Sequence, residues 1–195
     1  MKEPARFLSL VVDLPVTRLA LEFAADRHAD QRREADQAPF ILHPLEVAQL
    51  LRGRDYPDHV VAAGVLHDVL EDTDVDYAEL ERRFGPAVAT LVRAVSEPPG
   101  GGSYAVRKTR LREAVACATA DAAAVYAADK VAKVRELRID VVRRGERSSA
   151  IDSDKLDHYW ASLELLEHRL GHHPLVRQLR FELETLALLP PGETP

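Results

Sequence analysis

The sequence that decides the fold is VVAAGVLHDVLED, residues 60–72. Its first seven residues are apolar or small, and their spacing is helical rather than alternating. They run directly into His67 and Asp68, with Glu71 and Asp72 in the following turn. At about 100° per residue, His67 and Glu71 share one helical face. This stretch therefore predicts a buried helix whose end carries a dense group of polar, metal-ligating side chain types.

The acidic residues in this stretch raise the question of what neutralises them. Asp68, Glu71 and Asp72 lie within five residues of one another and repel unless a cation lies among them. A divalent metal ion is an economical cation, and adjacent His67 and Asp68 could both bind it if the helix end lets their side chains converge. The alternative is a helix C-terminus that runs into solvated acids, and the stretch alone leaves both open.

Helical periodicity continues on both sides of this stretch. Helices are expected at about residues 16–33, 44–53, 58–66, 76–84, 86–95, 104–119, 122–139, 153–170 and 174–189. The sequence PPGGG at 98–102 and the polar residues 143–149 are typical of loops. Period-two alternation is nearly absent, so we expect an all-α fold of about eight to ten helices. We expect one compact domain over residues 1–195, with its core at about 16–170 and a C-terminal helix at about 174–189.

Composition narrows the function classes. The chain has 195 residues, a formal net charge of −6, eight histidines and one cysteine. A single cysteine excludes an internal disulfide framework, a cysteine-rich zinc site and an iron–sulfur cluster, so a transition metal would need histidine and carboxylate ligands. The acidic balance argues against a general nucleic-acid binder. No apolar stretch near the start has the length of a membrane helix or the form of a signal peptide, so we expect a cytoplasmic protein with no membrane partner.

Two further positions carry ligand-type side chains. His43 lies in ILHP, residues 41–44, directly before the proline that is expected to open a helix. Asp129 lies in VYAADK, residues 125–130, on an otherwise apolar helical face, where an unpaired carboxylate would be costly. Taken singly, His43 could be a polar residue at a helix start and Asp129 could form a core salt bridge.

Taken together, four residues follow the H…HD…D pattern of the HD-domain metal site: His43, His67, Asp68 and Asp129. Longer stretches make the resemblance closer. The chain resembles the hydrolase domain of the Rel/SpoT alarmone enzymes and their small stand-alone relatives, including the metazoan SpoT homologue. The resemblance runs from about residue 19 to 140 and continues more weakly to 160. Its clearest stretches are AADRHADQRR at 24–33, PFILHPLEVA at 39–48, AAGVLHDVLEDT at 62–73 and FGPAV at 84–88.

This resemblance implies a metal-dependent phosphohydrolase that removes the 3′-pyrophosphate of guanosine 3′,5′-bis(diphosphate) with a water activated on one Mn²⁺. It implies that the four residues of the pattern bind the metal and that Glu71 and Asp72 are catalytic, acting on the water and shaping the site. Arg33 matches an arginine near the substrate, and Tyr159 falls near a position that touches nucleotide. The implied ligand is a small nucleotide polyphosphate rather than a nucleic acid, and a homo-oligomer is left open.

The chain departs from the family at two positions. Glu34 stands where these hydrolases usually carry a basic residue, and Lys133 stands where they carry asparagine. By helical spacing Lys133 faces the same side as Asp129, so it could pair with that carboxylate, lie in solvent or contact a substrate phosphate. These departures keep two alternatives open: a hydrolase of another nucleotide phosphate, such as an NADPH 2′-phosphatase or a nucleotidase, and a catalytically weak nucleotide sensor. A basic run at 107–112 is either a solvated face or a phosphate-attracting rim.

Overall fold

A computed structural model describes residues 13–144 and 151–188, and that part of the chain is almost entirely helical. Its helices are α2 Pro15–Arg27, α3 Leu42–Arg52, α4 Asp58–Leu66, α5 Val69–Asp72, α6 Tyr77–Val95, α7 Tyr104–Cys117, α8 Ala120–Arg144, α9 Ser153–Leu170 and α10 Pro174–Ala187. Within the described residues the only β-type pairing is one isolated bridge between Arg32 and Pro39. The expected all-α fold is therefore confirmed. None of the described helices is long and apolar enough to cross a membrane.

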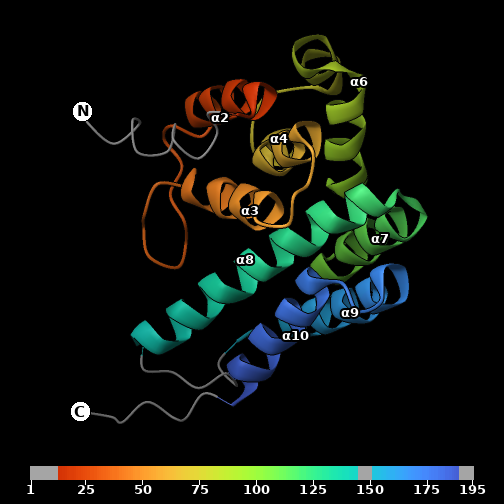
Figure 1. Cartoon of the computed structure of the whole chain (residues 1–195). Coiled ribbons are helices and arrows are strands. Elements are labelled where there is room, and N and C mark those ends of the chain that lie inside the picture. The colour runs from red at the N-terminus through yellow and green to blue at the C-terminus, as the bar shows by residue number, and fades with distance from the viewer. Residues whose placement is uncertain (1–12, 145–150, 189–195) are drawn as a thin grey trace.

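The long helix α8 is the centre of the arrangement. In Figure 1 it crosses the molecule diagonally, with α2, α3 and α4 on one side and α9 and α10 on the other. Its residues are buried without a break from Ala122 to Ala132, and many of them are alanines, whose small side chains let neighbouring helices approach closely. Asp129 and Lys130 belong to this buried run, so α8 carries two charged groups through the middle of the core.

The close approach of α3 and α4 depends on one glycine. A Cβ atom at Gly64 would lie 2.5 Å from Cδ1 of Leu51 and 3.2 Å from Cγ1 of Val47, both on α3. Glycine is therefore required here for packing rather than for backbone conformation. The close crossing matters because His43 lies in the first turn of α3 and His67 directly follows α4.

Two helix ends differ from those expected by five residues or more, while the other boundaries agree more closely. Helix α2 ends at Arg27 instead of continuing to residue 33, because the chain turns directly after it, where the carbonyl oxygen of His28 accepts from the backbone N–H of Gln31. Helix α8 continues to Arg144, where the buried Val141 anchors its last turns, so residues 143 and 144, which were expected in a loop, are helical. The rest of that loop lies outside the described residues. The expected break at 84–86 is confirmed, since Gly85 has a φ of 82° inside α6.

Candidate active site

Two histidines face each other where α3 and α4 meet. The Nδ1 atom of His67 lies 2.8 Å from the carbonyl oxygen of Gly64, and that of His43 lies 3.1 Å from Oε1 of Glu136. Both partners can only accept, so we assign the Nδ1 proton in each ring. In the neutral rings the Nε2 lone pairs therefore point into the site, where the two Nε2 atoms are 3.2 Å apart.

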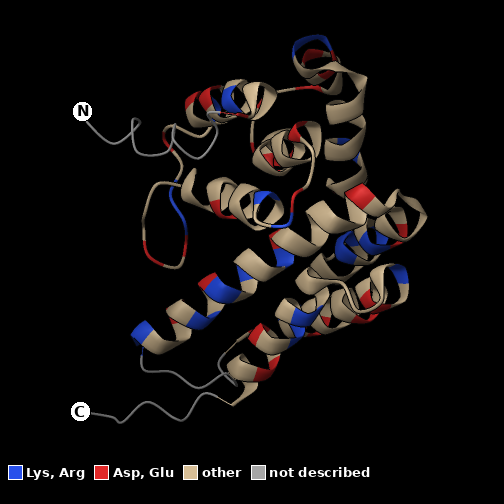
Figure 2. Cartoon of the chain, in the orientation of Figure 1, with Lys and Arg blue, Asp and Glu red and all other residues tan. Residues whose placement is uncertain are grey.

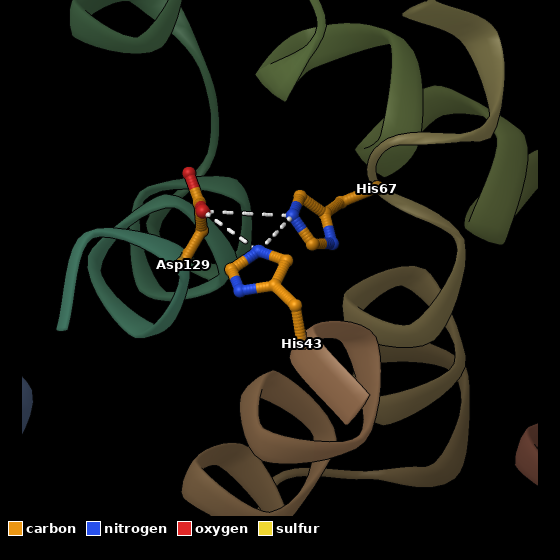
Figure 3. A group of neighbouring side chains, drawn as sticks. All are labelled: His43, His67 and Asp129. Carbon is orange, nitrogen blue, oxygen red and sulfur yellow. Dashed lines mark hydrogen bonds and ion pairs between the residues drawn. The ribbon is translucent and has the colours of Figure 1, made fainter. Parts of the chain in front are cut away.

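Two aspartates complete the group. Oδ1 of Asp129 lies 3.3 Å from Nε2 of His43 and 3.5 Å from Nε2 of His67, as Figure 3 shows. Asp68 adds Oδ1 at 3.2 Å from His67 Nε2 and Oδ2 at 3.7 Å from His43 Nε2. The adjacent His67 and Asp68 can converge because the helix is interrupted between Leu66 and Val69. The structure thus brings together all four residues of the H…HD…D pattern.

The chemistry of this group fits a cation. Among the described residues, Oδ2 of Asp68 and Oδ1 of Asp129 are buried without a hydrogen-bond partner, and His43, His67 and Asp129 present ligand-type atoms all within 4.8 Å of one another. Burial alone would lower the pKa of His67, but the neighbouring Asp68 and Asp129 outweigh it and raise that pKa to about 10. Two carboxylates that converge on two ring nitrogens call for a positive charge. Without an ion the raised pKa of His67 lets its ring supply that charge as a proton, and a divalent metal, which nitrogen and carboxylate oxygen suit, would replace the proton.

Glu71 and Asp72 lie at the edge of this group, on the short helix α5. Oε1 of Glu71 accepts a 2.7 Å hydrogen bond from the backbone N–H of Glu97, in the loop after α6. Desolvation and the nearby charge of Asp68 raise the pKa of both carboxyls. The expected continuous helical face joining His67 and Glu71 is wrong in detail, because α4 ends before His67 and α5 begins after Asp68.

A pocket of about 690 Å³ adjoins the histidine–aspartate group. Phe40, whose ring centroid is 5.9 Å from that of His43, and Glu136, which contacts the same ring, both line it. Cationic, aromatic and acidic side chains all line its wall. Figure 2 shows Lys and Arg distributed along the C-terminal half of α8. The charged and aromatic lining residues are Arg32, Arg33, Glu34, Phe40, Asp72, Tyr104, Lys108, Lys133, Glu136, Asp140, Arg144, Asp152, Lys155 and Tyr159.

The three residues expected to contact substrate all line this pocket, but their interactions with neighbouring side chains differ. They are Arg33, Lys133 and Tyr159. The guanidinium of Arg33 is held by Asp36, at 3.0 Å from its Nε, and by Glu136, at 3.5 Å from Nη1. Burial raises the pKa of Tyr159, which keeps its hydroxyl protonated. Lys133 places its ammonium 5.2 Å from the ring centroid of Phe40.

The proposed pairing of Lys133 with Asp129 does not form. Oδ2 of Asp129 instead accepts from Lys130 at 2.6 Å, and no ion pair to Lys133 exists among the described residues. Burial alone would lower the pKa of Lys133, but the charges of Asp68 and Asp129 outweigh it and raise that pKa. Lys133 is therefore a charged, pocket-lining ammonium close to the histidine–aspartate group. Glu34, the other departure, is 95% exposed at the pocket rim.

The basic run at 107–112 fits neither alternative fully. Arg107 pairs with Glu97 and donates to the carbonyl of Gly102, while Arg110 donates to the carbonyl of Gly101. Lys108 also pairs with Glu97, at 2.6 Å, and lines the pocket. Two of its four basic residues therefore hold the glycine loop in place, Lys108 reaches the pocket wall, and Arg112 instead contacts His158.

Three residues that support the site were not predicted from the sequence. Glu136 orients His43, Lys130 pairs with Asp129, and the backbone of Glu97 holds Glu71. Glu136 had a usable signal, since it follows Asp129 by seven residues and so shares its helical face. Lys130 resembled an ordinary solvated lysine, and a backbone donor leaves no mark in the sequence.

The fold and the site together define a class: an all-α protein in which two histidines and two aspartates from three separate segments surround a site suited to a divalent metal. The chain belongs to the HD domain family, which matches residues 20–171. The resemblance inferred from the sequence is therefore confirmed.

Individual relatives agree with this placement. The chain is 33% identical over 168 residues to a guanosine-3′,5′-bis(diphosphate) 3′-pyrophosphohydrolase of Aquifex aeolicus, covering 86% of this chain and 23% of that protein. It is 34% identical over 122 residues to the enzyme of the same activity called MESH1 in Xenopus tropicalis, covering 61% of this chain and 68% of that protein. A solved structure described as a metazoan ortholog of SpoT that hydrolyzes ppGpp superposes with a TM-score of 0.73 at 26% identity, over 89% of this chain and 97% of that one.

Proposed function

We propose that this chain is a metal-dependent phosphohydrolase that removes the 3′-pyrophosphate of guanosine 3′,5′-bis(diphosphate). The observation that carries the proposal is the convergence of His43, His67, Asp68 and Asp129 beside a pocket lined by cations and aromatic rings. The names of the A. aeolicus and X. tropicalis relatives support the substrate. The chain spans only 23% of the first of these proteins, so the support comes from a shared domain.

Those four side chains would hold the metal, for which we propose Mn²⁺. When bound, such an ion lowers the pKa of a water molecule and polarises a phosphoryl oxygen. The residues around it have separate tasks. Glu136 and the carbonyl of Gly64 fix the ring orientation of the two histidines, so that both Nε2 atoms face the site.

We assign to Glu71 the role of general base, which takes a proton from the attacking water. Its carboxylate is held by the N–H of Glu97, and its raised pKa brings it closer to the range in which a general base is effective. Asp72 lines the pocket next to it and shapes that part of the site.

Substrate binding falls to the pocket wall. Lys133 and Arg33 offset the charge of the phosphates, and Phe40 and Tyr159 offer ring faces to the nucleotide base. Arg33 must exchange part of its contact with Asp36 or Glu136 to do so.

Lys133 favours a second candidate within the same class. Because its ammonium has no ion-pair partner among the described residues and lines the pocket, it could bind a phosphate group placed differently from those of guanosine 3′,5′-bis(diphosphate). That arrangement suits the hydrolysis of another nucleotide phosphate, including an NADPH 2′-phosphate. It also suits a sensor that binds nucleotide with little turnover. A cytoplasmic location, the absence of a nucleic-acid partner and the oligomeric state stay predictions of the sequence.

An activity panel separates these candidates. Purified protein with added Mn²⁺ is given guanosine 3′,5′-bis(diphosphate), NADPH and nucleoside monophosphates, and released phosphate and pyrophosphate are measured. The proposal expects pyrophosphate from the first, and Asp68→Ala should abolish it. Asp74→Ala is a matched control, because that side chain is 85% exposed and makes only a 3.5 Å contact with Arg27. Release of phosphate from NADPH alone would select the second candidate, and tight binding without turnover would select the sensor.

A further inference from the structure

Lys130 is a charged side chain buried in the centre of the fold. Only 7% of it is exposed, and its Nζ donates to Oδ2 of Asp129 at 2.6 Å. Consecutive residues on a helix point about 100° apart, so the long lysine chain bends back to reach its neighbour. The ammonium also lies over the ring of Tyr126, with Nζ 4.5 Å from the ring centroid, in a cation–π contact. No second carboxylate pairs with Lys130 among the described residues, so its charge serves Asp129 alone.

The two oxygens of Asp129 have different surroundings. Oδ2 is occupied by Lys130, while Oδ1 is buried, has no hydrogen-bond partner and faces Nε2 of both His43 and His67. A carboxylate in this state can offer a metal one oxygen without losing its lysine contact. To offer both oxygens it would have to leave the ammonium of Lys130 buried and unpaired, which is costly.

The charge of Lys130 also changes the net formal charge of the site. In a metal-loaded site both histidines are neutral, and Asp68, Asp129 and Lys130 together contribute a formal charge of −1. A divalent ion raises this to +1, a sign that attracts a phosphorylated substrate. Without Lys130 the same loaded site would be neutral.

We propose that Lys130 is a positioning residue that keeps Asp129 to a single metal-facing oxygen and holds the affinity for the divalent ion down, so that the loaded site stays positive. The inference rests on the metal site of the proposed function but not on the identity of the substrate. A purely structural role for Lys130 predicts something different: its loss would loosen the site and weaken metal binding.

Mn²⁺ titration of variants separates the two roles. Lys130→Met keeps the chain length and removes the charge, and Lys130→Arg keeps the charge. Arg138→Met is a matched control, because it removes one positive charge from the same helix by breaking an ion pair with Glu182, which among the described residues has no hydrogen bond or ion pair with either site histidine. The measurements are the Kd for Mn²⁺ by calorimetry and the Tm with and without Mn²⁺.

The inference expects Lys130→Met to have a lower Tm without metal, a Kd for Mn²⁺ lower by about tenfold and a larger Mn²⁺-induced rise in Tm. Lys130→Arg should stay close to the wild type, and Arg138→Met should lose stability without a change in Kd. A Kd in Lys130→Met that is unchanged or higher would overturn the inference. If Lys130→Met does not fold, Lys130→Gln, which can still donate to Asp129, must show the same tighter binding. Wild-type protein that binds Mn²⁺ but cleaves no nucleotide would refute the proposed function alone.

Discussion

Replacing Gly64 by alanine tests whether the contact between α3 and α4 sets the distance between the two site histidines. The added Cβ would lie 2.5 Å from Cδ1 of Leu51, where ordinary contact begins at 3.4 Å. Leu51 is fully buried, so it must move by about 1 Å within a packed core or push the two helices apart. Because His43 and His67 lie next to this crossing, the second response widens their 3.2 Å separation.

The expected size follows from two opposing effects. Alanine in place of glycine stabilises a helix by about 1 kcal/mol. Overpacking a core costs about 1–3 kcal/mol. We expect Gly64→Ala to be destabilised by about 1 kcal/mol net, which lowers Tm by about 2–4 °C for a chain of this size. Displaced histidines should weaken Mn²⁺ binding by about tenfold.

Thermal unfolding and Mn²⁺ calorimetry measure both effects. Gly101→Ala is the matched control, since a Cβ there meets nothing within 4 Å and its φ is not positive. The reasoning is refuted if Gly64→Ala binds Mn²⁺ as the wild type does, or if it gains the full helix-propensity stabilisation. Either result would mean that the contact between α3 and α4 can accommodate a Cβ atom at residue 64 without moving the helices apart.

Two further predictions concern groups that touch the site residues. Glu136→Gln should raise the Kd for Mn²⁺ by about tenfold, because a neutral amide polarises the His43 ring less than a carboxylate does, and calorimetry showing an unchanged Kd would contradict that role. The pKa of Glu71 is raised by desolvation and held down by the N–H of Glu97. Hydrolysis by the ionised base should therefore fall as pH drops through this raised pKa. In Glu97→Pro, which lacks that N–H, the fall should occur at higher pH than in Glu97→Ala, which keeps it. Ser96 is already extended, as a following proline requires, and coincident pH–rate profiles would argue against Glu71 as the base.

The helical architecture was predictable because its signals are local. The apolar run at 60–66 and the Gly85–Pro86 break both appear in the structure where the sequence places them. The two largest errors in helix boundaries have different causes. A turn at residues 28–31 ends α2 early, and the burial of Val141 extends α8 into the first two residues of the expected loop.

The four ligand-type residues of the candidate site could be predicted from the sequence, but the residues that support them could not. His43, His67, Asp68 and Asp129 converge as the motif indicates, because the side chain types themselves carry the signal. The residues that support them depend on contacts between distant segments or on backbone atoms. The pairing of Lys130 with Asp129 was missed because helical spacing favours partners three or four residues apart and not the adjacent one.

The pocket wall supplies its own counterions. Arg33 is held by Asp36 and Glu136, Arg144 by Asp140, and Lys155 lies 4.0 Å from Glu34. At Arg33, Arg144 and Lys155 a polyanionic ligand would therefore enter by exchanging places with carboxylates of the protein, whereas Lys133, which has no ion-pair partner among the described residues, would meet it directly. Because such an exchange leaves the number of bound salt ions almost unchanged, ligand affinity should respond only weakly to ionic strength. When the ligand leaves, the displaced acids recapture their partners, which favours rapid dissociation of a highly charged product.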